Sequence, residues 1–207
     1  DDLSGFCILS YLFFPYITGK AFFFRIIIEV IFGLWLFLAW REPTYRPRKS
    51  WITIAIAGLV LVSTLATIFG ENPYRSFWSN FERMDGLVNY LHLLAYFLII
   101  SAMFRTERIW HWFFHASIGV SLIMVGYSFA QLSEVIPISQ GRLDATLGNA
   151  IYLAVYLLFQ AFLTAFLLFR NWNQRWTRYL YLPVILLQVY VLYKTATRGT
   201  ILGLLAG

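Results

Sequence analysis

The sequence is poor in charged residues, histidine and cysteine. Of its 207 residues 13% are charged, 3 are histidines, and Cys7 is the single cysteine. One cysteine excludes an internal disulfide and a cysteine-based metal site. The charged fraction is about half of that in soluble domains, which argues against a soluble globular protein. No phosphate-cradling P-loop, nucleophile elbow or metalloprotease motif occurs, so we expect neither a metal nor a cofactor.

Apolar residues dominate instead. They make up 60% of the chain, aromatic residues make up 20%, and the mean hydropathy is +0.68. These values indicate an integral membrane protein. The net charge of +6 comes from basic residues spread singly through short loops, so we expect no nucleic-acid partner. We attribute the basic excess to membrane topology and to an anionic ligand.

Seven apolar stretches reach or approach the length that a helix needs to cross a bilayer, which is about 20 residues. They run 3–18, 21–40, 51–69, 87–104, 109–132, 151–169 and 179–193, and an eighth begins near Gly199. We therefore predict an all-α fold, a polytopic transmembrane helical bundle of about seven complete spans plus the start of an eighth. It is expected to form a single integral membrane domain over residues 1–207. Because the chain lacks an initial methionine and stops inside the eighth apolar run, we expect it to be the N-terminal portion of a longer protein.

The basic residues in alternate loops set the predicted orientation. Nine Lys and Arg residues fall in brief loops on one face, and seven fall at or near the other. Because cytoplasmic loops carry more basic residues, the first face and the N-terminus are predicted to be cytoplasmic. Topology then gives no reason for the arginines on the outer face, which are Arg25, Arg75, Arg83, Arg142 and Arg198. We expect something anionic to dock there.

Two longer loops, residues 70–86 and 134–149, fall on the outer face. In the first, Asn72 and Pro73 are a favoured N-cap and a favoured first helical residue, so a short helix is predicted to start there. Apolar residues then recur at helical spacing as far as Met84, with polar residues on the other side. This pattern is typical of a helix that lies in the membrane interface.

Arg25 and Glu29 lie four residues apart in the second predicted span, so they share a helix face. Charge inside a membrane is a functional hypothesis by default. The alternative is that Arg25 extends to the nearby outer interface and that Glu29 neutralises it for structure alone.

Two further arginines lie at predicted helix starts on the outer face. Arg142 precedes the sixth span in a segment that ends at Asn149, and Arg198 follows Thr197 before the eighth. Helix N-termini attract phosphate through unpaired N–H groups and the helix dipole, so both segments are candidate anion sites. The alternatives are that Asn149 only caps the sixth span and that Arg142 only pairs with Asp144.

The three histidines have less specific patterns. His111 and His115 have chelating spacing, but they border Trp110 and Trp112, and we expect them in an interfacial aromatic belt. His92 is a candidate catalytic base, although a hydrogen-bonded core position is favoured.

Three segments resemble the O-antigen ligase family of polytopic inner-membrane glycosyltransferases. They are residues 83–96 (RMDGLVNYLHLLAY), 142–153 (RLDATLGNAIYL) and 195–203 (TATRGTILG). The sequence departs from the family at Ala150, where a proline commonly follows the asparagine.

The resemblance implies a multi-pass protein of the bacterial inner (cytoplasmic) membrane that works on the periplasmic face. It implies transfer of a glycan from undecaprenyl diphosphate to a lipid A core or similar acceptor, with membrane lipids around it. A departing diphosphate without a metal needs fixed cations, and arginine offers rigid bidentate donors. The residues expected to bind the polyprenyl diphosphate are Arg142 and Arg198 first, then Arg83 and Arg25, with Asn149 and Thr197 beside them. The family's base, a loop histidine, would follow Gly207, so we expect this chain to be inactive by itself.

Two alternatives remain. Some relatives of the family are linked to bicarbonate accumulation, so the chain could be a polytopic transporter that binds a small anion such as bicarbonate. A transporter should have polar residues along its spans, and few are evident beyond Arg25, Glu29 and Gln188. A membrane scaffold without a small-molecule ligand is the third interpretation, and it leaves the outer arginines unexplained.

Overall fold

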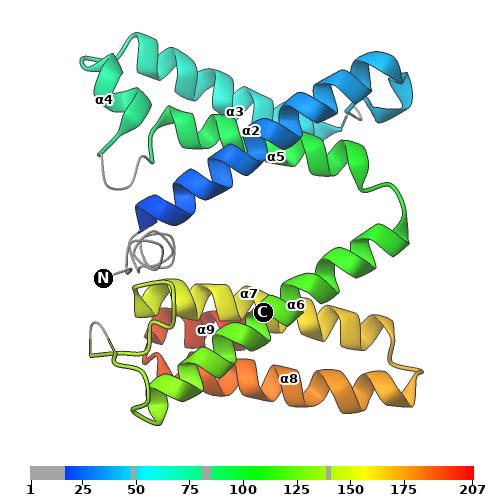
Figure 1. The fold of residues 1–207 in the computed structure, drawn as a ribbon, viewed down its shortest axis with the longest axis vertical. Coiled ribbons are helices and arrows are strands. Elements are labelled where there is room, and N and C mark those ends of the chain that lie inside the picture. The colour runs from blue at the N-terminus through cyan, green and yellow to red at the C-terminus, as the bar shows by residue number, and fades with distance from the viewer. Residues whose placement is uncertain (1–16, 48–49, 81–84, 139–140) are drawn as a thin grey trace, which may run out of the picture. The chain divides into compact units, whose positions relative to one another are not determined.

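The computed structural model describes residues 17–47, 50–80, 85–138 and 141–207, and all the regular structure in them is helical (Figure 1). The elements are α2 (Ile17–Arg41), η1 (Pro43–Tyr45), α3 (Trp51–Ile68), α4 (Pro73–Trp78), α5 (Leu87–Met103), α6 (Glu107–Leu132), α7 (Ala150–Arg170), α8 (Arg175–Lys194) and α9 (Arg198–Ala206). The predicted all-α class is confirmed for this part of the chain.

Four of the described helices are long and apolar enough to cross a membrane. They cover Ala21–Arg41, Trp51–Ile68, Glu107–Leu132 and Ala150–Arg170. α5 is apolar but shorter. α8 starts four residues before the predicted span, at Arg175, and its arginines and lysine lower its hydropathy. The predicted seven spans are therefore not confirmed; the first of them, residues 3–18, lies almost wholly outside the described residues.

Side-chain caps determine where three helices begin. Ser50 caps α3, Asn72 caps α4 and Asn149 caps α7, and each side-chain oxygen accepts a backbone N–H of the first turn at 2.8 to 3.2 Å. Such caps satisfy N–H groups that have no partner within the helix. The predicted short helix that starts at Pro73 is thus confirmed, together with its cap.

The short helix α4 is nevertheless shorter than the predicted interfacial helix. It ends at Trp78, because Ser79 adopts φ 62°, outside the helical region, while its N–H still bonds to the carbonyl of Arg75. The helical pattern predicted to continue to Met84 is therefore wrong at Ser79. Residues 81–84, which include Arg83 and Met84, lie outside the described residues.

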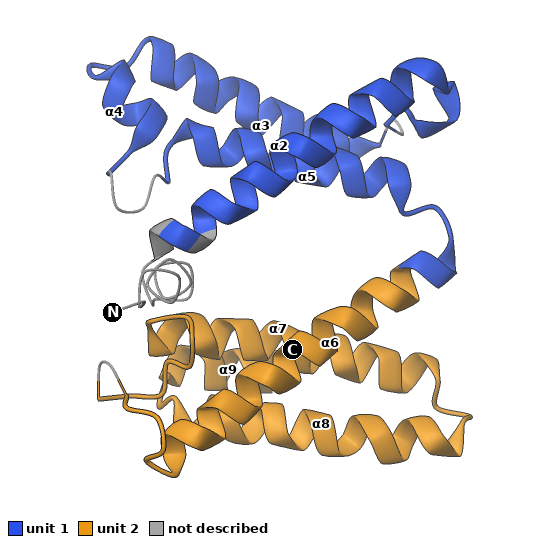
Figure 2. Cartoon of the chain, in the orientation of Figure 1, with its two compact units in different colours: residues 1–13, 17–109 blue, residues 14–16, 110–207 orange. Residues whose placement is uncertain are grey.

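The chain forms two compact units (Figure 2). In unit 1, the described residues up to Ile109, α5 packs against α2, α3 and α4. In unit 2, from Trp110 onward, α7 packs along α8, α9 contacts both, and α6 joins them through a shared apolar core. That core contains Met124, Val125, Leu153, Leu157, Val191 and Leu192.

Large apolar side chains cover much of the surface of both units. On α2, Leu34 is 67% exposed and Trp40 is 74% exposed; on α3, Leu61 and Val62 are likewise exposed. The backbone hydrogen bonds of a helix are made within the helix itself, so it can lie in lipid. Its exposed apolar side chains are then in contact with the hydrocarbon of the bilayer and not with water. The structure therefore supports a helical membrane protein.

Candidate functional site

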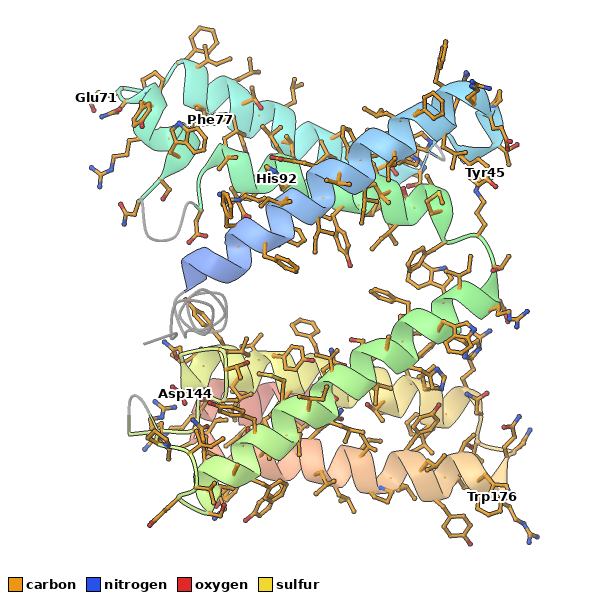
Figure 3. All side chains as sticks on the ribbon, in the orientation of Figure 1. Tyr45, Glu71, Phe77, His92, Asp144 and Trp176 are labelled. Atoms are coloured by element: carbon orange, nitrogen blue, oxygen red, sulfur yellow. The ribbon has the colours of Figure 1, made fainter. Side chains whose placement is uncertain are left out.

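The candidate site lies in unit 2 and is built from two loops, residues 141–149 and 195–198, which we call the loop site. The first loop follows α6 and leads into α7; the second joins α8 to α9. Within unit 2, Asp144 lies at the same end as these loops, and Trp176, near the start of α8, lies at the opposite end (Figure 3). The loop site is thus one end of a helical bundle.

Arg142 joins the two loops. Its Nε donates to the carbonyl oxygen of Thr195 at 3.1 Å, its Nη2 donates to the same oxygen at 2.8 Å, and Nη2 also donates to Oγ1 of Thr197 at 3.1 Å. Arg142 and Thr195 are 53 residues apart in the sequence. The predicted sites around Arg142 and Arg198 are therefore adjacent in the structure.

Arg198 is the second cation of the loop site. It is the first residue of α9 and its side chain is exposed. Among the described residues its guanidinium has no hydrogen-bond or ion-pair partner. No described residue therefore occupies its five N–H donors, whereas Arg142 uses part of its guanidinium to bond to the second loop.

A buried polar pair that was not predicted from the sequence lies beside Arg142. Gln131, in the last turn of α6, donates from Nε2 to Oδ1 of Asp144 at 2.8 Å and accepts from the backbone N–H of Ala145 at 2.9 Å. Gln131 and Asp144 are 3% and 1% exposed. Ala145 has φ 46°, an uncommon value for a residue with a side chain. Gln131 therefore fixes a strained turn beside Arg142, and Asp144 has a partner other than Arg142.

Asn149 and Thr197, the two polar residues expected beside the arginines, have distinct roles. The side-chain oxygen of Asn149 accepts the N–H of Ile151 at 2.8 Å and so caps α7. Thr197 is the N-cap residue of α9 but makes no capping bond with its side chain. Its hydroxyl accepts instead from Arg142, at the edge of the loop site.

The candidate residues in unit 1 are Arg25, Glu29, His92 and Arg83, and the surroundings of the first three differ. Arg25 on α2 is buried, at 6% exposure, while Glu29 is 67% exposed. Oε1 of Glu29 lies 3.1 Å from Nε2 of His92 on α5, and Nδ1 of His92 lies 2.7 Å from the carbonyl of Val88. His92 is thus hydrogen-bonded through both ring nitrogens to Val88 and Glu29. Arg83 lies outside the described residues.

Polar side chains also meet in the middle of unit 2, where few were expected. Gln188 on α8 donates to Oγ of Ser121 on α6 at 2.7 Å and accepts from Thr164 on α7 at 3.2 Å. Gln160 on α7 donates to Oγ of Ser117 at 2.8 Å. We call these five residues the mid-bundle cluster. The sequence contained an indication of this cluster: Ser117 and Ser121 are four residues apart, as are Gln160 and Thr164, so each pair shares one face of its helix.

His115, one of the two histidines predicted to lie in an aromatic belt, is hydrogen-bonded through both ring nitrogens. Nε2 of His115 lies 2.7 Å from the hydroxyl of Tyr181, and its Nδ1 lies 2.6 Å from the carbonyl of His111. Within the described ranges, no group of three or more His, Cys, Asp or Glu side chains is placed to hold a metal ion.

Comparison of the chain with protein-family models, with curated proteins and with solved structures gives no match. Function is therefore inferred from the geometry of the loop site and from the resemblance of its segments.

Proposed function

We propose that the chain is part of a membrane glycosyltransferase of the O-antigen ligase type, and that the loop site binds the diphosphate of a polyprenyl-linked glycan. The observation that carries the proposal is the bonding of Arg142 to Thr195 and Thr197. Two of the three segments that resemble the family meet in this contact. A shared ligand at the meeting point explains why both segments contain an arginine.

The chemistry of glycan transfer fits a site in which one arginine is hydrogen-bonded to the protein and the other is available to the ligand. As the bond from the glycan to the diphosphate breaks, negative charge develops on the departing oxygens, and fixed donors aimed at that charge lower the barrier. Arg142 is held in place by the second loop, while the guanidinium of Arg198 has no partner among the described residues. In this proposal Arg142 positions the site and Arg198 carries most of the direct contact with the diphosphate.

The proposal includes a topology. The loop site lies on the periplasmic face of a bacterial inner membrane, the N-terminus is cytoplasmic, and α5 and α8 cross the bilayer in addition to the four longer helices, within a bundle of seven spans. The acceptor, a lipid A core sugar or another glycan, approaches from the periplasm. Cysteine accessibility at Thr146 tests the orientation, since labelling only from the cytoplasm would contradict it.

Binding of undecaprenyl diphosphate to the purified chain, followed by native mass spectrometry, tests the site. Arg198→Ala is expected to weaken binding about tenfold or more, because it removes hydrogen bonds to a charged group. Arg198→Lys should bind undecaprenyl diphosphate more tightly than Arg198→Ala and less tightly than the parent chain, since lysine keeps the positive charge but lacks the planar, bidentate donors of a guanidinium. Arg175→Ala is the matched control, an exposed arginine at the start of α8 at the opposite end of unit 2. Equal losses in Arg198→Ala and Arg175→Ala would remove the assignment.

The mid-bundle cluster favours a second candidate, transport of a small anion. Polar side chains inside a bundle mark ion pathways in some membrane proteins, although they also join helices in others. Bicarbonate flux into liposomes containing the chain separates the two functions. Flux above that of empty liposomes that is lost in Gln188→Leu, with undecaprenyl diphosphate binding unchanged, would favour the transporter over the glycosyltransferase.

A further inference from the structure

A polar pocket in unit 1 is not used by the proposed function. It has a volume of about 330 Å³ and lies where the C-terminal half of α3, the short helix α4 and the start of α5 meet. The residues that matter here are Arg75, Ser76, Ser79, Asp85 and Tyr90. We call it the α4 pocket.

The walls of the α4 pocket are closely packed. A β-carbon added to Gly86 would clash with the carbonyl group of Phe77, so the chain before α5 runs directly against the end of α4. On the α3 side, the hydroxyls of Ser63 and Thr67 donate to carbonyls of the preceding turn at 2.9 and 2.8 Å. Their oxygens therefore face the pocket as acceptors with their protons already committed.

Two opposite charges line the α4 pocket without pairing. Arg75 and Asp85 are both exposed, and within the described residues neither side chain makes a hydrogen bond or an ion pair. Two such groups in one small pocket fit a ligand that carries a negative and a positive group of its own. A purely anionic ligand would leave its charge next to Asp85, and a purely cationic one would leave its charge next to Arg75.

Three hydroxyls complete the polar lining. The side chains of Ser76, Ser79 and Tyr90 have no hydrogen-bond partner among the residues that the structure describes. Hydroxyl donors and a guanidinium together are suited to the oxygens of a phosphate.

The position of the α4 pocket indicates where such a ligand comes from. α3 is apolar enough to span a membrane, and the pocket opens near its C-terminal end. Leu59 and Val62 on α3 are exposed, and Tyr74 and Trp78 on α4 are exposed aromatics of the kind that line membrane interfaces. A lipid would match both features, because its polar headgroup would occupy the pocket and its acyl chains would contact the exposed apolar side chains of α3.

We propose that the α4 pocket binds the phosphoethanolamine headgroup of a membrane phospholipid, with the phosphate on Arg75 and the ammonium on Asp85. A primary ammonium donates hydrogen bonds to a carboxylate, whereas the quaternary ammonium of a choline lipid has no N–H to donate. A glycerol headgroup provides no cation for Asp85. The pocket therefore discriminates among phospholipids by headgroup, independently of the loop site.

Native mass spectrometry with equal amounts of dioleoyl phosphatidylethanolamine, phosphatidylcholine and phosphatidylglycerol tests the proposal. The chain should retain the ethanolamine lipid about tenfold or more above the other two, the size expected of charge-assisted hydrogen bonds. Asp85→Asn should abolish the preference over the choline lipid. Arg75→Gln should lower retention of the ethanolamine lipid and the choline lipid alike. Glu71→Gln, which changes an exposed acid outside the pocket, should leave the preference intact.

Three outcomes would overturn the proposal. One is equal retention of the three lipids by the chain, and another is an unchanged preference in Asp85→Asn. The third is binding of free O-phosphoethanolamine as tight as that of the whole lipid, which would make the pocket a site for a soluble zwitterion. Thermal unfolding of Asp85→Asn and Arg75→Gln should match that of the parent chain, because both side chains are exposed and make no hydrogen bond or ion pair with a described residue.

Discussion

The guanidinium of Arg142 donates two hydrogen bonds to one carbonyl oxygen, that of Thr195, from Nε at 3.1 Å and from Nη2 at 2.8 Å. Thr195 is fully buried at the C-terminal end of α8. A charged donor thus satisfies a carbonyl at the end of a helix, where partners within the helix run out. The contact stabilises the fold as well as the loop site.

Arg142→Ala is expected to lower the free energy of unfolding by about 1.5 to 3 kcal/mol, the range for hydrogen bonds to a charged group. Thermal unfolding in detergent micelles measures the change. Arg198→Ala is the control, because the described structure gives its side chain no partner to lose. If both variants unfold at the temperature of the parent chain, the link from Arg142 to Thr195 has no structural role.

Gln131→Leu should destabilise the chain at least as much as Arg142→Ala does. The substitution leaves the buried Oδ1 of Asp144 and the N–H of Ala145 without these bonds, at about 1 to 3 kcal/mol for each unsatisfied group. Gln174→Leu is the matched control, since Gln174 is exposed and makes no capping bond with its side chain. Chemical denaturation of the two variants side by side distinguishes a specific role of Gln131 from a general effect of the substitution.

Gly86→Ala should cost roughly 1 to 3 kcal/mol, as expected when an added methyl group forces the backbone to move. The added β-carbon meets the carbonyl of Phe77, which is backbone and cannot rotate away. Gly58→Ala, in α3, has open space at the same position and should be neutral or slightly stabilising, because alanine favours a helix. Similar unfolding of the two variants would contradict the tight contact of α4 with the start of α5.

Substitution of Gln188 tests how much the hydrogen bonds of the mid-bundle cluster stabilise unit 2. Gln188→Leu should lower stability by about 0.6 to 2 kcal/mol, the range for polar contacts between membrane helices. The loss arises because Ser121 and Thr164 each lose a partner. Combining it with Ser121→Ala should cost less than the sum of the single changes, as a double-mutant cycle would measure. Strict additivity would show that the hydrogen bond between the two residues contributes nothing.

Local signals predicted much of the helical structure. Apolar length placed α3, α5, α6 and α7 within about two residues of the observed bounds, and Asn72 identified the start of α4. Asn149 caps α7, which was the alternative to its predicted place in an anion site. The end of α4 could not be predicted in the same way. The helix ends where Ser79 adopts a positive φ, next to the place where Gly86 packs against α4. No residue type in this part of the sequence requires a positive φ at Ser79.

The candidate site shows the same division between local and non-local signals. Arg142 and Arg198 stood out because cations are unexpected at the predicted outer face. Gln131 did not, because one glutamine near the end of an apolar run is unremarkable until its partners 13 and 14 residues later are known. The bond from Arg142 to Thr195 spans a longer separation still and follows only from the packing of α6, α7 and α8.

Both polar atoms of the Gln131 amide bond to the first loop, so a movement of α6 is expected to move that loop with it. Membrane helices change their tilt when the hydrocarbon thickness around them changes. A thicker or thinner bilayer that re-tilts α6 would therefore alter the spacing between Arg142 and Arg198. We therefore expect the acyl-chain length of the surrounding lipids to change the distance between the two guanidinium groups.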